Sequence, residues 1–240
     1  MNQASVGFHC PECARSGRQR IVPLRSLATR PVVTMALVAA NLAIFVADAI
    51  SRGRLGNSLG DWGDEGALYG PAVAAGDWWR PFTAGFLHVG LIHVGFNMFL
   101  LWQLGSLLEP AVKRFPFTVL YVLSLLGGSF LVLVLSPDSV TVGASGAVFG
   151  LMGAAFVALR SRGIDPFSTG IGPLIVINLL FTFALPGISI GGHIGGLVAG
   201  AAGGVILWQW APRLGPRSPL PVLSCLALAG LLYVGCLLVV

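Results

Sequence analysis

Charged side chains are scarce in this chain of 240 residues. Asp, Glu, Lys and Arg together make up 10% of the sequence, whereas 55% of the residues are hydrophobic and the mean hydropathy is +0.86. A soluble globular domain carries about 25% charged residues, which it needs to cover its surface. The shortage of charge excludes a soluble globule and indicates a protein that crosses a membrane several times.

Uncharged runs between charged or Pro- and Gly-rich breaks predict the transmembrane helices. A helix needs about 20 mostly apolar residues to cross a bilayer. We therefore predict an all-α polytopic membrane protein. The first apolar run follows about 30 polar and basic residues, so we expect it to be kept as a span rather than removed as a signal. The seven predicted spans are 32–50, 83–104, 115–135, 144–160, 170–187, 191–210 and 220–239.

Basic residues are missing from two of the loops between these spans, 136–143 and 186–192. Three of the fourteen Lys and Arg residues share the long first loop with acidic residues, and the other eleven precede the first span or lie in the alternate loops. Cytoplasmic loops carry an excess of Lys and Arg, so we predict a cytoplasmic N-terminus and an external C-terminus. A basic cytoplasmic face suits anionic lipids, so the pI near 9.5 gives no reason to expect a nucleic-acid partner.

Four polar side chains of the predicted spans can lie at one depth below the outer surface. Ser145 and His193 each open a span that starts outside, and His93 and Asn97 lie in the second span, which also starts outside. Polar groups at bilayer depth are costly unless they are paired, which makes them candidates for function. His93 and Asn97 share a helix face, whereas His88 points about 140° away.

These residue types together suit acyl transfer. A serine hydroxyl becomes a nucleophile when an imidazole takes its proton, and the oxyanion that forms needs donors placed in advance. Ser145, His193 and the pair of His93 and Asn97 supply one of each. No carboxylate lies near His193 in sequence or in predicted depth, so the pattern predicts a dyad rather than a triad. Phe149, one turn after Ser145, is placed to stack on the imidazole and orient it.

Glycines surround the serine and recur along two spans. Gly143 and Gly146 leave Ser145 unshielded. Small residues at four-residue spacing let two helices approach closely, so the spans that carry Ser145 and His193 are expected to touch. Their glycine series are Gly146 and Gly150 on one span and Gly192, Gly196 and Gly200 on the other.

Four stretches, taken together, resemble the rhomboid family of intramembrane serine proteases. They are "GASG" around Ser145, "HVGLIHVGFN", "GGHIGGLVAG" and the "WWR" of the first loop. The resemblance covers about residues 33–210. It implies a cytoplasmic tail at 1–31, a six-helix rhomboid core at 32–210, and a linker with an appended seventh transmembrane helix at 211–240.

The resemblance also implies an activity and a set of roles. Rhomboid proteases cut transmembrane helices of other proteins near one membrane face and use no metal or cofactor, so it implies membrane-protein substrates in a bacterial-type plasma membrane. By this resemblance, Ser145 is the nucleophile and His193 the general base, and the oxyanion site is formed by His93, Asn97 and the Ser145 backbone N–H. His88 has a structural role near the site. Trp79 and Arg80 shape the membrane-embedded first loop, and Glu109 braces that loop from the second span.

Other readings of the same residues stay open. Taken alone, a serine among glycines is more often a packing residue. A catalytically silent rhomboid-like protein that binds transmembrane helices is one alternative, although such a protein would be expected to lose Ser145 or His193. A histidine-dependent transporter is a more distant alternative. It predicts acidic partners for the histidines inside the spans, and no acidic residue lies centrally in a predicted span. Joint occurrence of nucleophile, base and oxyanion donors favours catalysis, and the oligomeric state is left open.

The four cysteines divide into two pairs. Cys225 and Cys236 lie in the last predicted span and are expected to be apolar packing residues. The stretch "HCPEC" holds His9, Cys10 and Cys13, and a C-x-x-C pair supplies two of the four ligands of a zinc site. It resembles the second half of a zinc ribbon that precedes some bacterial rhomboids. Zinc binding and a reduced pair without metal are both open readings.

Overall fold

The computed structural model describes residues 2–3, 8–9, 30–51, 60–215 and 218–240. The chain divides into two compact units, Met1–Arg30 and Pro31–Val240. In the first unit, strand β1 (Asn2–Gln3) pairs antiparallel with β2 (Phe8–His9). Cys10 and Cys13 lie outside the described residues, so the predicted C-x-x-C metal site stays untested.

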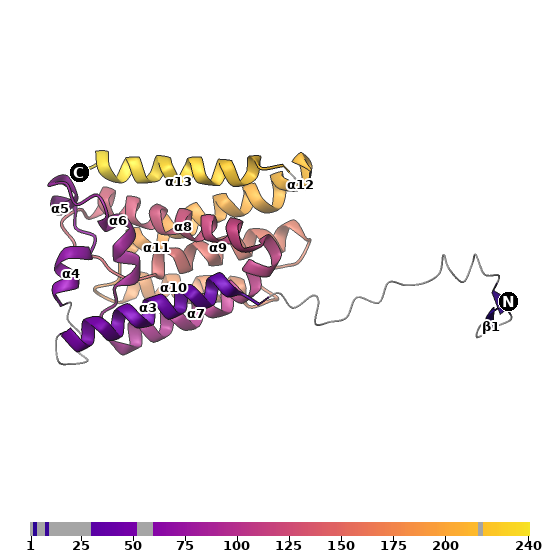
Figure 1. The fold of residues 1–240 in the computed structure, drawn as a ribbon, viewed down its shortest axis with the longest axis horizontal. Helices are drawn as coiled ribbons and strands as arrows, with labels where there is room; N and C mark the ends of the chain where they lie inside the picture. The colour runs from indigo at the N-terminus through magenta and orange to yellow at the C-terminus, as the bar shows by residue number, and fades with distance from the viewer. Residues whose placement is uncertain (1, 4–7, 10–29, 52–59, 216–217) are drawn as a thin grey trace. The chain divides into compact units, whose positions relative to one another are not determined.

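Long helices build the second unit (Figure 1). Within the described part of the chain, five helical stretches are long and apolar enough to cross a membrane, and two more apolar helices are shorter. The predicted all-α polytopic membrane fold is confirmed. The helices are α3 (Val32–Ser51), α7 (Gly90–Val112), α8 (Arg114–Leu135), α9 (Ser145–Ser161), α10 (Ile171–Ala184), α11 (Ile190–Gly204), which continues through the π-helical η2 (Val205–Trp210) into α12 (Ala211–Leu214), and α13 (Leu220–Leu238).

The second predicted span is displaced in the structure. The sequence placed it at 83–104, but α7 begins at Gly90, whose φ of 78° breaks the helical path. The apolar residues before it form two short elements of the first loop instead, α6 (Arg80–Thr83) and η1 (Ala84–Phe86). As a result His88 lies outside α7, whereas His93 and Asn97 lie near its start.

The core lies between α8, α9 and α11. Figure 1 shows α13 along one side of the bundle and α3 with α7 along the other. Leu120, Leu123 and Leu126 of α8 are buried almost completely. The glycines of α11 let its backbone touch both neighbours: a Cβ on Gly195 would collide with the Gly127 carbonyl of α8, and a Cβ on Gly196 with the Gly146 carbonyl of α9. The predicted close approach of small residues therefore occurs at the centre of the fold.

The first loop covers one end of the bundle. It contains α4 (Asp61–Gly66) and α5 (Gly70–Ala74) besides α6 and η1, and Figure 1 shows these elements at the end where the C-terminus lies. The appended helix α13 contacts this loop, because the Tyr233 hydroxyl donates to the Trp78 carbonyl at 3.3 Å and the Tyr233 ring lies 5.1 Å from that of Phe82. Helix α13, which also packs on α8, thus supports the loop.

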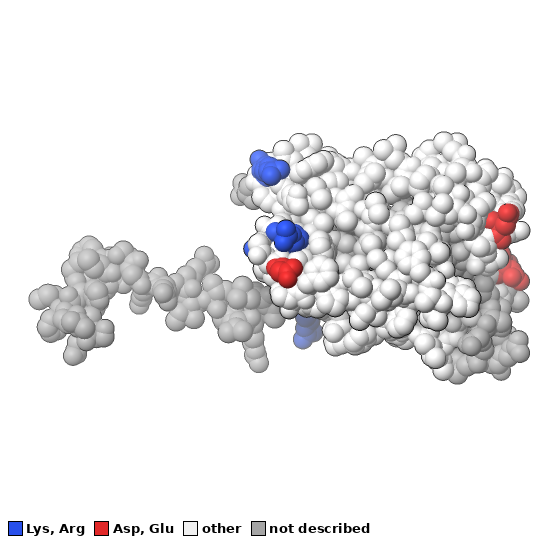
Figure 2. Space-filling model, turned by 180° about the vertical axis from the view of Figure 1, so that it is seen from behind, with Lys and Arg blue, Asp and Glu red and all other residues white. Residues whose placement is uncertain are grey.

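Charge is confined to the ends of the body on the face that Figure 2 shows. Lys and Arg gather at one end of that face, Asp and Glu are prominent at the other, and the broad band between them carries no coloured residue. An uncharged band suits the hydrocarbon layer of a bilayer, whereas charged ends suit its two surfaces.

Candidate active site

Ser145 is the first residue of α9 and follows a tight turn. Gly143 has a φ of 121°, a conformation that L side chains rarely adopt, and its N–H donates to the Ala84 carbonyl at 2.9 Å. The first N–H groups of an α-helix have no partner within the helix and form its positive end. Ser145 therefore presents its hydroxyl beside backbone donors that can receive negative charge.

His93 lies against the same turn. A Cβ on Gly143 would stand 2.7 Å from His93 Nε2 and 3.8 Å from Ser145 Oγ, so the ring and the hydroxyl border one small volume. Asn97 Nδ2 donates to the carbonyl of His93 at 3.0 Å, which leaves its second amide hydrogen available. Glycine is required at 143 because any side chain there would displace the imidazole.

His88 also contacts this turn. Its Nε2 accepts the N–H of Ala144 at 3.4 Å, and its ring lies 5.0 Å from that of His93. Burial, together with the nearby His93, lowers the pKa of His88 to about 3. The ring is therefore neutral at ordinary pH and can accept a hydrogen bond, which fits the structural role expected for it.

His193 is held near the start of α11 by two contacts. Its ring stacks on Phe149, with centroids 4.0 Å apart and planes 17° apart, and its Nδ1 lies 2.7 Å from Thr182 Oγ1 of α10. The backbone brings α11 against α9, since a Cβ on Gly146 would stand 3.2 Å from the Gly192 carbonyl. Phe149 is one turn after Ser145, so the stack places the imidazole on the side of α9 that carries the serine.

The Ser145 hydroxyl and the His193 ring, both within the described residues, share no hydrogen bond in this structure. Hydrogen bonds between a nucleophile and its base are often long without substrate and tighten in the complex. The structure thus brings Ser145, Gly143 and His93 together on one side and Phe149, Thr182 and His193 on the other.

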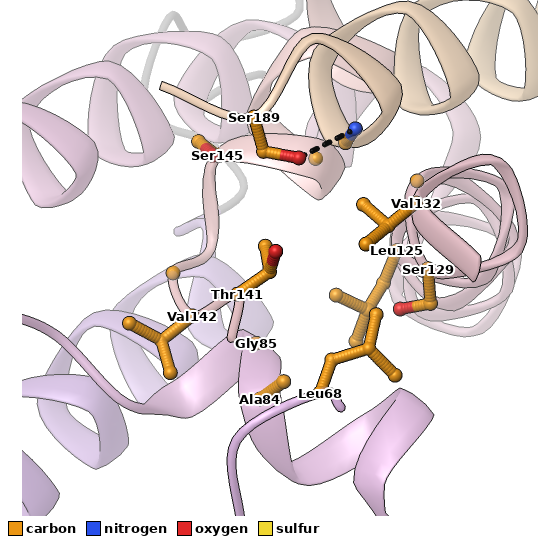
Figure 3. Close-up of a pocket in the computed structure, with 14 residues that line it drawn as sticks. Leu68, Ala84, Gly85, Leu125, Ser129, Val132, Thr141, Val142, Ser145 and Ser189 are labelled. Carbon is orange, nitrogen blue, oxygen red and sulfur yellow. Dashed lines mark hydrogen bonds between the residues drawn. The ribbon is translucent and has the colours of Figure 1, made fainter. Parts of the chain in front are cut away.

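A pocket opens beside Ser145 (Figure 3). It holds about 20 Å³, close to the room that one water molecule needs. Figure 3 shows Thr141 and Val142 on one wall and side chains of α8, among them Ser129, on the other. Ser189 lies above them and accepts the Gly192 N–H at 3.1 Å.

Comparison with known proteins settles the family. A family model described as a Rhomboid domain matches residues 75–210, more than half of the chain. This chain belongs to the rhomboid family. The resemblance seen in the sequence is confirmed.

Relatives of this rhomboid occur in distant organisms. Rhomboid protease GluP of Bacillus subtilis is 37% identical over 174 residues, which cover 71% of this chain and 34% of GluP. Rhomboid-like protease 1 of Toxoplasma gondii is 34% identical over 59% of this chain and 51% of its own length. YdcA of Bacillus subtilis is 34% identical over 58% of this chain and 72% of its own length. The chain thus spans between a third and about half of the first two relatives.

Trp79 and Arg80 of this rhomboid tie the first loop together. Arg80 is buried, pairs with Asp77 at 2.7 Å and donates to the carbonyls of Ala67 and Asp64, each at 2.8 Å. The Trp79 indole N–H donates to the Glu65 carbonyl at 3.0 Å. These bonds join α4 to the start of α6 across the loop. Trp79 and Arg80 are therefore placed to hold the loop in its shape.

The role expected for Glu109 is wrong. Glu109 lies near the C-terminal end of α7, whereas the first loop precedes the N-terminal end of this helix. The Glu109 carboxylate binds the start of α3. It accepts the Val33 N–H at 2.9 Å and the Thr34 N–H and hydroxyl at 2.8 Å each. A carboxylate is favourable at a helix N-terminus because it satisfies free N–H groups and the helix dipole. Glu109 therefore fastens α7 to α3 and does not brace the loop.

Replacing Glu109 by alanine is expected to lower the free energy of unfolding by about 2 kcal/mol, because buried donors of α3 lose their acceptor. Thermal unfolding in detergent, followed by circular dichroism, measures the effect. Glu65→Ala, which removes an exposed carboxylate, is the matched control and should unfold with the wild type. Equal stability of the two variants would contradict the capping role.

Thr182 is the residue of this site that sequence reasoning missed. The available signal was the four-residue spacing of Asn178 and Thr182 in an otherwise apolar helix, which puts two polar groups on one helix face.

Among the residues that the structure describes, no three His, Cys, Asp or Glu side chains gather closely enough to hold a metal ion.

Proposed function

We propose that this rhomboid is an intramembrane serine endopeptidase that cleaves transmembrane segments of other proteins near the outer leaflet, with Ser145 and His193 as a dyad. The observation that carries the proposal is the packing of α9 on α11. It sets the serine at a glycine-flanked helix start and stacks the imidazole on Phe149, one turn further along the same helix. The names of relatives such as GluP, a rhomboid protease, add support.

The proposed reaction proceeds through an acyl-enzyme. His193 Nε2 takes the hydroxyl proton as Ser145 Oγ attacks the peptide carbonyl carbon, and the oxyanion is received by the Ser145 N–H, His93 and Asn97. The C–N bond then breaks as His193 returns the proton to the leaving amine. Water attacks the ester with His193 again as base, and the serine is restored. These steps draw on side chains, backbone and water, with no metal or cofactor.

The charge distribution supports the proposed orientation. Three helices that start or end near the site carry basic residues toward their opposite ends: Arg114 opens α8, Arg160 lies in the last turn of α9, and Arg213 lies in α12, which continues α11. Because Lys and Arg favour the cytoplasmic side, Ser145 lies toward the external side of a bacterial-type plasma membrane, with the N-terminus inside and the C-terminus outside.

Substrate choice follows from the helical state of the substrate. A peptide bond in a helix is shielded, so the segment must unwind at the site, where protein and water replace lipid as partners for its backbone. The pocket beside Ser145 holds about 20 Å³, and so small a volume favours a small side chain over a large one. Transmembrane segments with small residues at the depth of Ser145 are therefore the proposed substrates.

Reporter cleavage with covalent labelling tests the proposal. Purified protein in liposomes is given a single-span reporter with alanines at the depth of the site, and a matched reporter with leucines there. We expect the alanine reporter to be cut faster, and a fluorophosphonate to stop cleavage and to modify Ser145 but not the exposed Ser139, as read by peptide mass. Cleavage that persists under the probe, or modification at another serine, would refute the dyad. Binding of the reporter without cleavage or labelling would indicate the silent, helix-binding alternative.

A further inference from the structure

The imidazole of His193 has a second neighbour besides Phe149. Thr182 lies in the last turn of α10, and its hydroxyl oxygen is 2.7 Å from His193 Nδ1. Both side chains are buried, with 2% and 9% of their surfaces exposed. Either group can be the donor in such a contact, because a neutral imidazole carries its proton on Nδ1 or on Nε2. The direction of this hydrogen bond decides which nitrogen faces the serine with a lone pair.

The other bond of Thr182 fixes that direction. Thr182 Oγ1 also lies 2.7 Å from the carbonyl oxygen of Asn178, one turn back on α10. A carbonyl only accepts, so the single hydroxyl proton of Thr182 is used there. The hydroxyl can then only accept from His193, and Nδ1 must carry the proton. Neutral His193 is thereby held with a free lone pair on Nε2, the nitrogen that a base for Ser145 needs.

Stacking alone does not achieve this selection. A half-turn of the imidazole about its Cβ–Cγ bond leaves the ring in the same plane, so contact with Phe149 is kept while the two edges of the ring exchange places. The bond to Thr182 distinguishes the two edges. It also survives catalysis, because the imidazolium that forms after proton transfer still donates from Nδ1.

We propose that Thr182 is a positioning residue of the dyad, which sets the tautomer and ring orientation of His193 in place of the carboxylate of a serine-protease triad. This rests on the proposed function, in which His193 is the base. In a triad, the acid holds the imidazole in the correct tautomer, and a variant with the wrong tautomer loses most of its kcat. Thr182 is uncharged, so it supplies the orientation without the charge.

Three variants separate this role from packing. Thr182→Val keeps the shape and removes the hydroxyl, whereas Thr182→Ser keeps the hydroxyl. Thr118→Val is the matched control, because the Thr118 hydroxyl makes the same bond to a carbonyl one turn back, that of Arg114 at 3.0 Å, and makes no hydrogen bond to a histidine that the described structure records. We expect Thr182→Val to lower kcat about 10- to 100-fold with KM nearly unchanged, less than the loss of a charged triad acid. The serine and Thr118 variants should stay near wild type.

Nitrogen-15 NMR of the full-length protein, labelled in its histidine rings, supplies a readout that needs no substrate. At about pH 8, where imidazole is neutral, we expect the His193 signals, assigned by their loss in His193→Ala, to show a protonated Nδ1 and an unprotonated Nε2. Thr182→Ser should keep this pattern and Thr182→Val should lose it.

Two outcomes would overturn the inference: a wild-type His193 with its proton on Nε2, or a Thr182→Val variant with wild-type kcat. If Thr182→Val unfolds, the wild-type and Thr182→Ser spectra still decide. If the wild type neither cleaves reporters nor reacts at Ser145, the protease proposal fails, while the spectra report separately whether Thr182 sets the tautomer.

Discussion

Replacing either Ser145 or His193 by alanine is expected to lower kcat at least about 10³-fold, and replacing both should lower it little further, because nucleophile and base act as one unit. Without the imidazole, the hydroxyl keeps its proton and remains a weak nucleophile. Without the hydroxyl, the imidazole has no proton to take. The residual rate should be that of the reporter alone plus what the oxyanion donors contribute.

Both single variants and the double variant are measured on the alanine reporter in liposomes. Loss of activity through unfolding is a small risk for Ser145→Ala, because this hydroxyl makes no hydrogen bond that the described structure records. Ser139→Ala, in an exposed loop, is the matched control and should keep wild-type kcat. A double variant whose loss equals the product of the two single losses would mean that the residues act independently, which contradicts a dyad.

The sequence could predict the fold class because the bilayer restricts the available structures. A chain with little charge and long apolar runs must form helices that satisfy their own backbone. The error at the second span has the same origin, since hydropathy does not distinguish lipid contact from burial in protein. Ala84, Gly85 and Leu87 fall inside the predicted span 83–104, but the structure buries them within the first loop, and their apolar character alone does not reveal this.

The sequence could predict the residue types at the site but not the partners of their side chains. Spacing along one helix put Phe149 one turn from Ser145, and the structure shows the stack on His193. The partners of Glu109 and Thr182 lie on other helices, at sequence separations that only the fold defines. A buried carboxylate or hydroxyl signals that some partner exists, but the packing of the helices decides which one.

Gly200→Ala is expected to be the most disruptive small change in the core. A Cβ there would collide with backbone atoms of Gly150, its Cα, carbonyl carbon and oxygen, so no flexible side chain can move aside. Gly200 is an ordinary helical position, so only the close approach of α11 to α9 demands glycine. Overpacking of a rigid contact costs about 3 kcal/mol, and the separation of the helices would also draw His193 away from Ser145.

Gly230→Ala in α13 is the matched control, because a Cβ at Gly230 would meet no atom within 4 Å. There the substitution removes only the conformational freedom of glycine, which favours the helix by about 0.5–1 kcal/mol. The two variants should therefore differ in both measurements. Gly200→Ala should have lower thermal stability and should lose reporter cleavage. Gly230→Ala should have unchanged or higher thermal stability and should cleave the reporter normally. If the two variants behaved alike, close backbone contact between α9 and α11 could not be what aligns the serine with the imidazole.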